Sequence, residues 1–148
     1  MQVEQVNYPE LVAIGFEVEA GRRDLPVAVP AAWRRLFERD TGATSFLALG
    51  LARKGDLCRE MVGYLAASRT EVPEGMTRRV VPAGTYLRTV HDGPLSSIPA
   101  VFEALYAYAA LKGLRAGDLR LDFGYLPGLP RGRHELHIAI EAPRVLLG

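Results

Sequence analysis

An internal repetition is the feature that most constrains the fold of this chain. Two apolar stretches, residues 59–64 and residues 134–139, each carry one glutamate, and these glutamates lie 75 positions apart. Other matches recur at offsets between 69 and 75: residues 29–37 match residues 98–106, and residues 49–51 match residues 123–125. Two copies are too few for a solenoid, so the repetition predicts one domain built from two related halves.

Each half has the pattern strand–strand–helix–strand–strand. Alternating apolar residues bounded by proline and glycine predict strands over residues 3–8, 11–20, 46–52 and 57–67, and again over residues 76–81, 84–91, 119–126 and 133–142. Helices are predicted to begin near Pro30 and near Ser97 or Pro99, because proline suits the first helical turn. A polar linker, residues 68–75, separates repeats of about residues 1–67 and 76–142.

This order predicts a single α+β domain over residues 1–148, with two main helices packed against one antiparallel sheet. The two halves are expected to be related by a pseudo-twofold axis. A central groove is expected between them, because ligands commonly bind between related units.

Composition excludes several classes of function. The formal net charge is +1, and 49% of the residues are hydrophobic, so no strong general attraction to nucleic acid or to anionic membranes is expected. No apolar run is long enough to span a membrane, and no signal-peptide pattern is present. The single cysteine, Cys58, cannot form an internal disulfide, which favours a cytoplasmic location.

The two glutamates are the leading candidate site residues. A carboxylate in an apolar strand is costly to desolvate unless a partner or ligand uses it. Strand alternation places Glu135 and His137 on one face, and Glu60 with Tyr64 on the corresponding face of the sister strand. Each glutamate also has a simpler interpretation: Glu135 as a strand-end charge paired with an arginine such as Arg133, and Glu60 as a solvent-exposed residue.

Aromatic residues are the second group of candidates. We expect two or three of them to meet at the groove, although each alone is commonly a core residue: Trp33, Tyr64, Tyr86, Tyr106 and Tyr125. Aromatic rings beside a carboxylate suit an organic cation. The same carboxylate, with its pKa raised in an apolar pocket, would also suit protonation of a strained ring or activation of water. The residues leave these two uses open.

No cofactor or metal is predicted. The pair His134 and His137 is a poor zinc site, because residues three apart on a strand point to opposite faces. The chain also lacks a phosphate-binding P-loop and a dinucleotide-binding glycine fingerprint.

The sequence resembles the GyrI-like family, also known as the AraC-type effector-binding or Rob/BmrR C-terminal ligand-binding domain. The resemblance is carried by Tyr86 followed by residues 91–94 (HDGP) leading into an aromatic helix, by residues 123–125 (FGY), and by the closing strand, residues 135–140. Trp33 stands where that family has a tryptophan in its first helix.

This resemblance implies a duplicated βαββ, SHS2-like fold whose groove takes hydrophobic, often cationic or aromatic small molecules. It gives Glu135 the role of the deep groove carboxylate. The full set of expected ligand-binding residues is Glu135, Glu60, Trp33, Tyr64, Tyr106, Tyr125 and His137.

The resemblance further implies a free-standing small-molecule-binding protein, used in sensing or sequestering drugs or toxins. A separate regulatory protein is a possible partner, with no direct binding of nucleic acid or membrane. Two alternatives follow from other branches of the family. One is a hydrolase of cyclopropane-type genotoxins, with Glu135 and Glu60 as its catalytic candidates. The other is a gyrase-inhibitor-like interaction protein.

Overall fold

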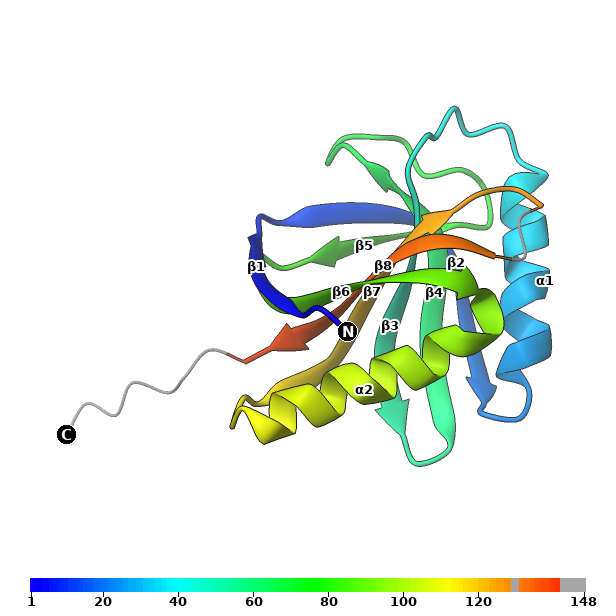
Figure 1. The fold of residues 1–148 in the computed structure, drawn as a ribbon. Coiled ribbons are helices and arrows are strands. Elements are labelled where there is room, and N and C mark those ends of the chain that lie inside the picture. Colours follow the sequence, from blue (N-terminus) through cyan, green and yellow to red (C-terminus); the bar gives the residue numbers. More distant parts are fainter. Residues whose placement is uncertain (129–130, 142–148) are drawn as a thin grey trace.

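The structure, a computed structural model, describes residues 1–128 and 131–141. Its described part forms one eight-stranded antiparallel sheet with two α-helices and a short 3-10 helix (Figure 1). The elements in chain order are β1 (Glu4–Tyr8), β2 (Leu11–Gly21), α1 (Leu25–Phe37), β3 (Phe46–Lys54), β4 (Leu57–Ala66), β5 (Thr77–Val81), β6 (Gly84–Pro94), η1 (Leu95–Ser97), α2 (Ile98–Leu111), β7 (Ala116–Tyr125) and β8 (Arg131–Ile140).

The strand order is symmetric about its centre. It runs β1-β6-β8-β7-β3-β4-β2-β5, so each side of the central β7–β3 pair repeats the same succession of strands. The first strand of each half pairs at the outer edge of the other half: β1 with β6, and β5 with β2. The α+β fold expected from the sequence, with two helices on an antiparallel sheet, is confirmed.

Helix α1 begins earlier than predicted. It starts at Leu25 rather than near Pro30, with a proline in its first turn, and Pro30 lies inside the helix. Pro26 is therefore the helix-starting proline, since a missing N–H costs nothing there. Pro30 is exposed, so its ring meets solvent on the outer side of the helix.

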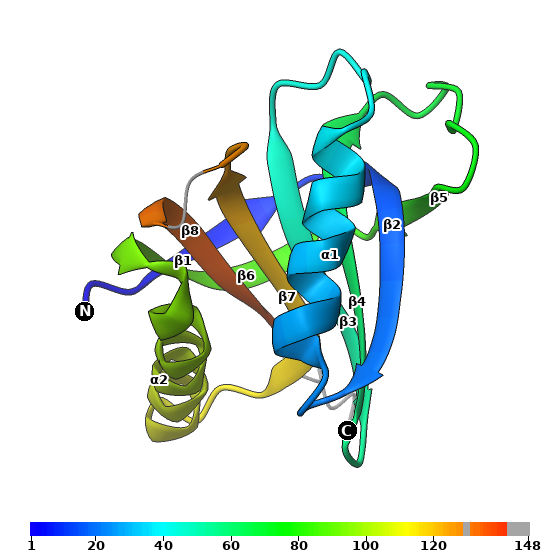
Figure 2. The same ribbon diagram turned by 90° about the vertical axis from the view of Figure 1, so that its right-hand side faces the viewer.

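Both helices cover one side of the sheet, which we call the helix face. Helix α1 packs on β2 and β4, and helix α2 packs on β6, β8 and β7. Figure 2 shows the two helices on this side, with strands visible between them. Trp33 and Leu36 anchor α1 in one apolar cluster, and Phe102 and Leu105 anchor α2 in another.

The opposite side, the inner face, is buried without a helix. Two-residue connections join β1 to β2 and β5 to β6, although these strands lie near opposite ends of the strand order. The sheet must therefore curl until its two edges approach each other. The curled side encloses a third apolar cluster of buried residues: Ala13, Leu47, Leu49, Met61, Val81, Tyr86 and Leu121.

A glycine pair lies at the β2–β4 contact. Gly15 pairs with Gly63, and a Cβ built on Gly15 would lie 2.0 Å from the carbonyl oxygen of Val62. Only glycine permits this approach of the two backbones.

No helix in the described part of the chain is both long and apolar enough to cross a membrane.

Candidate functional site

The two glutamates of the repeat lie on opposite faces of the sheet. Glu60 is on the helix face with Val62, whereas Glu135 is on the inner face with His137. Strand pairing explains this. Ala48 of β3 pairs with Asp122 of β7 at the centre of the sheet, and the residues paired with them on the next strands are Val62 of β4 and Leu136 of β8. Equivalent positions of β4 and β8 are therefore 74 residues apart, whereas Glu60 and Glu135 are 75 apart, and a shift of one residue reverses the face of a strand.

Glu135 is already neutralised. Its Oε1 accepts hydrogen bonds from Arg88 Nη2 at 2.7 Å and from Arg133 Nη1 at 3.3 Å. Burial alone would raise the pKa of Glu135, but the contacts with Arg88 and Arg133 outweigh it and hold the pKa below its usual range. The structure thus separates Glu135 from Trp33, Tyr64, Tyr106 and Tyr125, which pack in the helix-face clusters, and pairs it with arginines.

His137 is a buried structural residue of the inner face. Its Nδ1 lies 3.4 Å from the carbonyl oxygen of Leu121, which can only accept. Nδ1 therefore carries the proton, and Nε2 accepts a hydrogen bond from the Tyr8 hydroxyl at 2.6 Å. Burial lowers the pKa of His137 to about 4, so the ring is neutral at physiological pH. This contact fastens β1 to the rest of the sheet.

Of the five expected aromatic residues, Tyr86 is buried in the apolar cluster of the inner face, and the other four lie under the two helices. Trp33 and Tyr125 stack at a centroid distance of 4.3 Å. Tyr64 is buried in the cluster under α1. Tyr106 packs with the α2 cluster and donates a hydrogen bond to the carbonyl oxygen of Gly117 at 3.0 Å. Only Trp33 and Tyr125, of these four, are in ring-to-ring contact.

Polar side chains gather on the helix face between the two helices. They come from α1, β4, β7 and β8: Trp33, Glu60, Arg120, Asp122, Tyr125 and His134. Together with Ala48 and Gly50 of β3, we call these residues the inter-helix site. Ala48 is partly exposed although it lies in a central strand. Solvent therefore reaches the sheet at this point.

Arg120 and Glu60 form the first part of the inter-helix site. The guanidinium of Arg120 lies over Gly50 and reaches from β7 across β3, so that Nη2 is 3.4 Å from Glu60 Oε1. Phe102 of α2 lies on the same guanidinium, with its ring centroid 5.4 Å away. Burial raises the pKa of Glu60, and the positive charges of Arg120 and Arg53 oppose this only in part.

Asp122 organises the second part. It accepts a hydrogen bond from the Tyr125 hydroxyl at 2.6 Å and one from His134 Nδ1 at 2.9 Å. Burial raises the pKa of Asp122, while His134 and Tyr125 act in the opposite direction. Within residues 1–128 and 131–141, no three His, Cys, Asp or Glu side chains are grouped so that they could hold a metal ion.

Sequence reasoning missed Arg120 and Asp122, and it considered His134 only as a metal ligand. A signal was present in β7, where Arg120 and Asp122 alternate with apolar residues and so share one face. Their meeting with Glu60 and His134 depends on strand pairing across the centre of the sheet, which spacing alone does not reveal.

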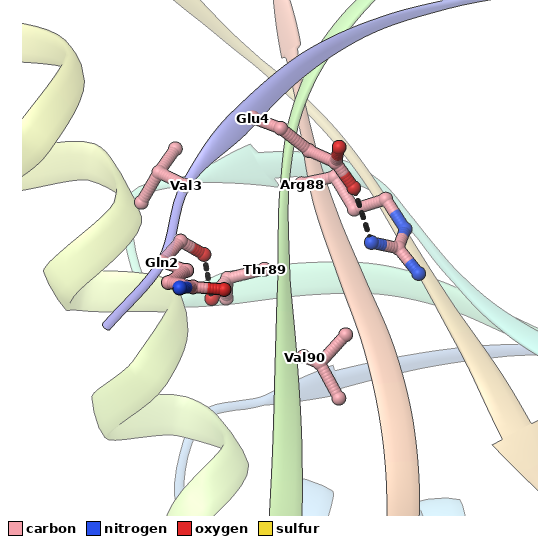
Figure 3. Close-up of a pocket in the computed structure, with 6 residues that line it drawn as sticks. All are labelled: Gln2, Val3, Glu4, Arg88, Thr89 and Val90. Carbon is pink, nitrogen blue, oxygen red and sulfur yellow. Dashed lines mark hydrogen bonds and ion pairs between the residues drawn. The ribbon is translucent and has the colours of Figure 1, made fainter.

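A separate groove of about 550 Å³ lies beside the N-terminal segment (Figure 3). It is lined by Gln2, Val3, Glu4, Arg88, Thr89 and Val90, none of which belongs to the inter-helix site. Its polar groups are paired internally: Thr89 donates to the carbonyl oxygen of Gln2, and Arg88 pairs with Glu4. This groove therefore offers a ligand few free polar groups.

Comparison with known proteins identifies the fold. By sequence, no family model and no curated protein matches the chain. By structure, it is similar to SAV2435 bound to tetraphenylphosphonium, with a TM-score of 0.71 and 11% identity over 95% of this chain and 94% of that one. The EcmrR C-terminal domain has a TM-score of 0.65 and 14% identity, covering 95% and 97% of the two chains.

A hydrolase from Listeria innocua also shares the fold, with a TM-score of 0.57 and 11% identity over 95% of this chain and 92% of that one. At such identities the likeness establishes the fold. The chain shares the fold of these proteins, which is the GyrI-like fold that the resemblance in sequence implied.

Proposed function

We propose that this chain binds lipophilic aromatic small molecules at the inter-helix site, with a cationic group of the ligand placed against Glu60. The observation that carries this proposal is the state of Glu60. It is a desolvated carboxylate whose hydrogen bond to Arg120 is long, 3.4 Å, and it lies on the face where solvent reaches Ala48. Binding of this kind would serve the sensing or sequestration of drugs or toxins.

The stacked pair Trp33 and Tyr125 supplies the aromatic part of the site. The faces of Trp33 are covered by Phe37 and Tyr125, so the pair offers a ligand an apolar aromatic surface, and the carboxylate of Glu60 supplies the neutralisation of a cationic group. A partly buried carboxylate whose ion pair is long raises the free energy of the unliganded protein. A cation that enters the site removes that cost. SAV2435, which has the same fold, was solved with tetraphenylphosphonium, a lipophilic cation.

Calorimetry with a charged and a neutral ligand of similar shape tests this proposal. Tetraphenylphosphonium and triphenylphosphine oxide form a suitable pair. In Glu60→Gln the cation should bind roughly ten- to hundredfold more weakly, because a charge-assisted contact is lost, while the neutral compound should be unaffected. Glu135→Gln is the matched control and should leave both affinities unchanged, because Glu135 lies on the inner face.

Two outcomes would contradict the proposal. Loss of cation binding in Glu135→Gln but not in Glu60→Gln would assign the ligand to the inner face. Absence of binding of both compounds by the unmodified protein would remove the small-molecule function at this site.

A second candidate function is hydrolysis of a reactive electrophile. The supporting observation is that Glu60, with its raised pKa, shares the inter-helix site with the hydrogen-bonded chain Tyr125–Asp122–His134. A carboxyl whose pKa is raised by burial holds its proton more readily, which suits a general acid. Turnover of a strained cyclopropane electrophile that Glu60→Gln abolishes would favour this function over simple binding.

A further inference from the structure

Two hydrogen-bond donors of the inter-helix site have no acceptor. Among the buried side-chain nitrogen and oxygen atoms of residues 1–128 and 132–141, only Arg120 Nε and Trp33 Nε1 lack a hydrogen-bond partner. Arg120 and Trp33 are each 8% exposed. Buried polar groups are nearly always paired in folded proteins, so two orphaned donors in one site require an explanation.

The position of Arg120 makes this more specific. Nε and Nη2 form one edge of the guanidinium, which can hold a carboxylate through two parallel hydrogen bonds. Glu60 contacts only Nη2, and at 3.4 Å. Because Gly50 has no side chain, the guanidinium can lie against the sheet, where a Cβ would be 2.4 Å from Nε. The Nε–Nη2 edge is therefore fixed in position, but only Nη2 has a hydrogen-bond acceptor.

The charges around the site are balanced. Glu60 and Asp122 are the acidic groups, and Arg120 and Arg53 are the basic groups that act on Glu60. A purely cationic ligand placed against Glu60 also meets the positive charge of Arg120. A purely anionic ligand placed against Arg120 meets Glu60. A ligand with both charges satisfies both residues.

We propose, as an extension that rests on the function proposed above, that the ligand of the inter-helix site is an aromatic zwitterion whose carboxylate binds Arg120 while its cationic group faces Glu60. The carboxylate occupies the Nε–Nη2 edge and frees Glu60 from its long contact. In the alternative, the carboxylate of Glu60 itself moves closer to the guanidinium of Arg120 and accepts its hydrogen bonds. The site would then show no preference for a ligand that carries a carboxylate.

Two dyes that differ only in the carboxylate test this inference. Tetramethylrhodamine carries a free carboxylate and a cationic ring system, and its methyl ester is a plain cation. By fluorescence polarisation at neutral pH, the acid should bind the unmodified protein about tenfold more tightly than the ester. In Arg120→Gln the acid should lose about tenfold in affinity and the ester should not, so that the preference disappears.

A matched control separates a directed contact from general positive charge. Arg53 is exposed and close enough to act on Glu60 and Arg120, so Arg53→Gln removes the same charge without removing the buried edge. The preference for the acid should survive in Arg53→Gln. If Arg120→Gln does not fold, as judged by circular dichroism, Arg120→Lys serves instead: it keeps the charge, lacks the planar edge, and should also lose the preference.

The outcomes distinguish this inference from the proposed function. Equal binding of acid and ester, an unchanged preference in Arg120→Gln, or equal effects of Arg53→Gln and Arg120→Gln would overturn the zwitterion. Each of these results would leave the proposed binding of lipophilic aromatic small molecules uncontradicted. Binding of tetraphenylphosphonium but of neither dye would also overturn the zwitterion alone. Failure of all three compounds to bind would overturn both proposals.

Discussion

The guanidinium of Arg120 occupies the space beside Gly50 that a side chain would fill, so that a Cβ at position 50 would be 2.4 Å from Nε and 2.6 Å from Nη2. One glycine in a central strand thus gives a buried arginine its place on the helix face. The relationship joins β3 and β7, the two strands at the centre of the symmetric sheet. The position of the positive charge of Arg120 in the inter-helix site therefore depends on Gly50, which has no side chain of its own.

Gly50→Ala should therefore change binding more than stability. The atoms that a methyl group would meet are the end of a flexible side chain, so Arg120 can swing away, and we expect a loss of at most about 1–2 kcal/mol in the free energy of unfolding. The displaced guanidinium should no longer distinguish the acid dye from its ester. Urea unfolding and fluorescence polarisation measure the two effects. Retention of the distinction would show that Arg120 does not act from this position.

Gly15→Ala should do the opposite. Here a Cβ would meet backbone, 2.0 Å from the carbonyl oxygen of Val62 and 2.5 Å from the α-carbon of Gly63, and neither can move without separating β2 from β4. We expect a loss of about 3 kcal/mol or more in the free energy of unfolding, at the upper end of overpacking effects. Denaturant titration of Gly15→Ala beside Gly50→Ala gives the comparison. Equal stability of the two variants would contradict the close approach of the strands.

The sequence predicted the fold well because its signals are local. Prolines, glycines and alternating apolar residues mark most of the strands and both helices, and these signals do not depend on distant contacts. The start of α1 was misplaced because Pro26 and Pro30 both suit a first turn, and the apolar pattern near Trp33 pointed to the second. Trp33 and Leu36 are three residues apart, about one helical turn, and both are buried in the structure.

The candidate site was harder to predict because it depends on register. Glu60 and Glu135 match each other in sequence, but strand faces alternate with every residue, and a match displaced by one position reverses the face. Glu60 on β4 and His134 on β8, the partners of Arg120 and Asp122 from other strands, meet them only through pairing across the sheet. Such a grouping has no spacing in the sequence from which to derive it.

Acid should destabilise the protein through His137. Its pKa is about 4 when folded, against an ordinary value of 6.5, because burial disfavours the charged ring. Above pH 6.5 the ring is neutral in both states and contributes no pH dependence. As the pH falls from 6.5 to about 4, the unfolded chain binds a proton that the folded chain does not, so stability falls, by about 3 kcal/mol in total.

Urea unfolding between pH 8 and pH 4.5 measures this effect. His137→Gln should be less stable at pH 8 but should lose little further stability on acidification. Tyr8→Phe removes the hydrogen bond to Nε2 and keeps the titrating ring, so its pH dependence should resemble that of the unmodified protein. Glu60 and Asp122, whose pKa values are raised, act with the opposite sign, and the comparison between variants cancels them. Equal slopes for His137→Gln and the unmodified protein would contradict the prediction.

Binding of a lipophilic cation should be coupled to loss of a proton from Glu60. Burial raises the pKa of Glu60 in the free protein, and a bound cation stabilises the carboxylate and lowers that pKa again. Below the free-state pKa, each cation bound must displace a proton, so affinity should rise about tenfold per pH unit and then level off above that pKa.

Calorimetry of tetraphenylphosphonium in buffers of different ionisation enthalpy counts the protons released. Glu60→Gln should abolish both the release and the slope. Glu135→Gln should preserve them, because arginines already hold the pKa of Glu135 low and keep it ionised. An identical pH profile for Glu60→Gln and the unmodified protein would show that another group carries the charge that the cation meets.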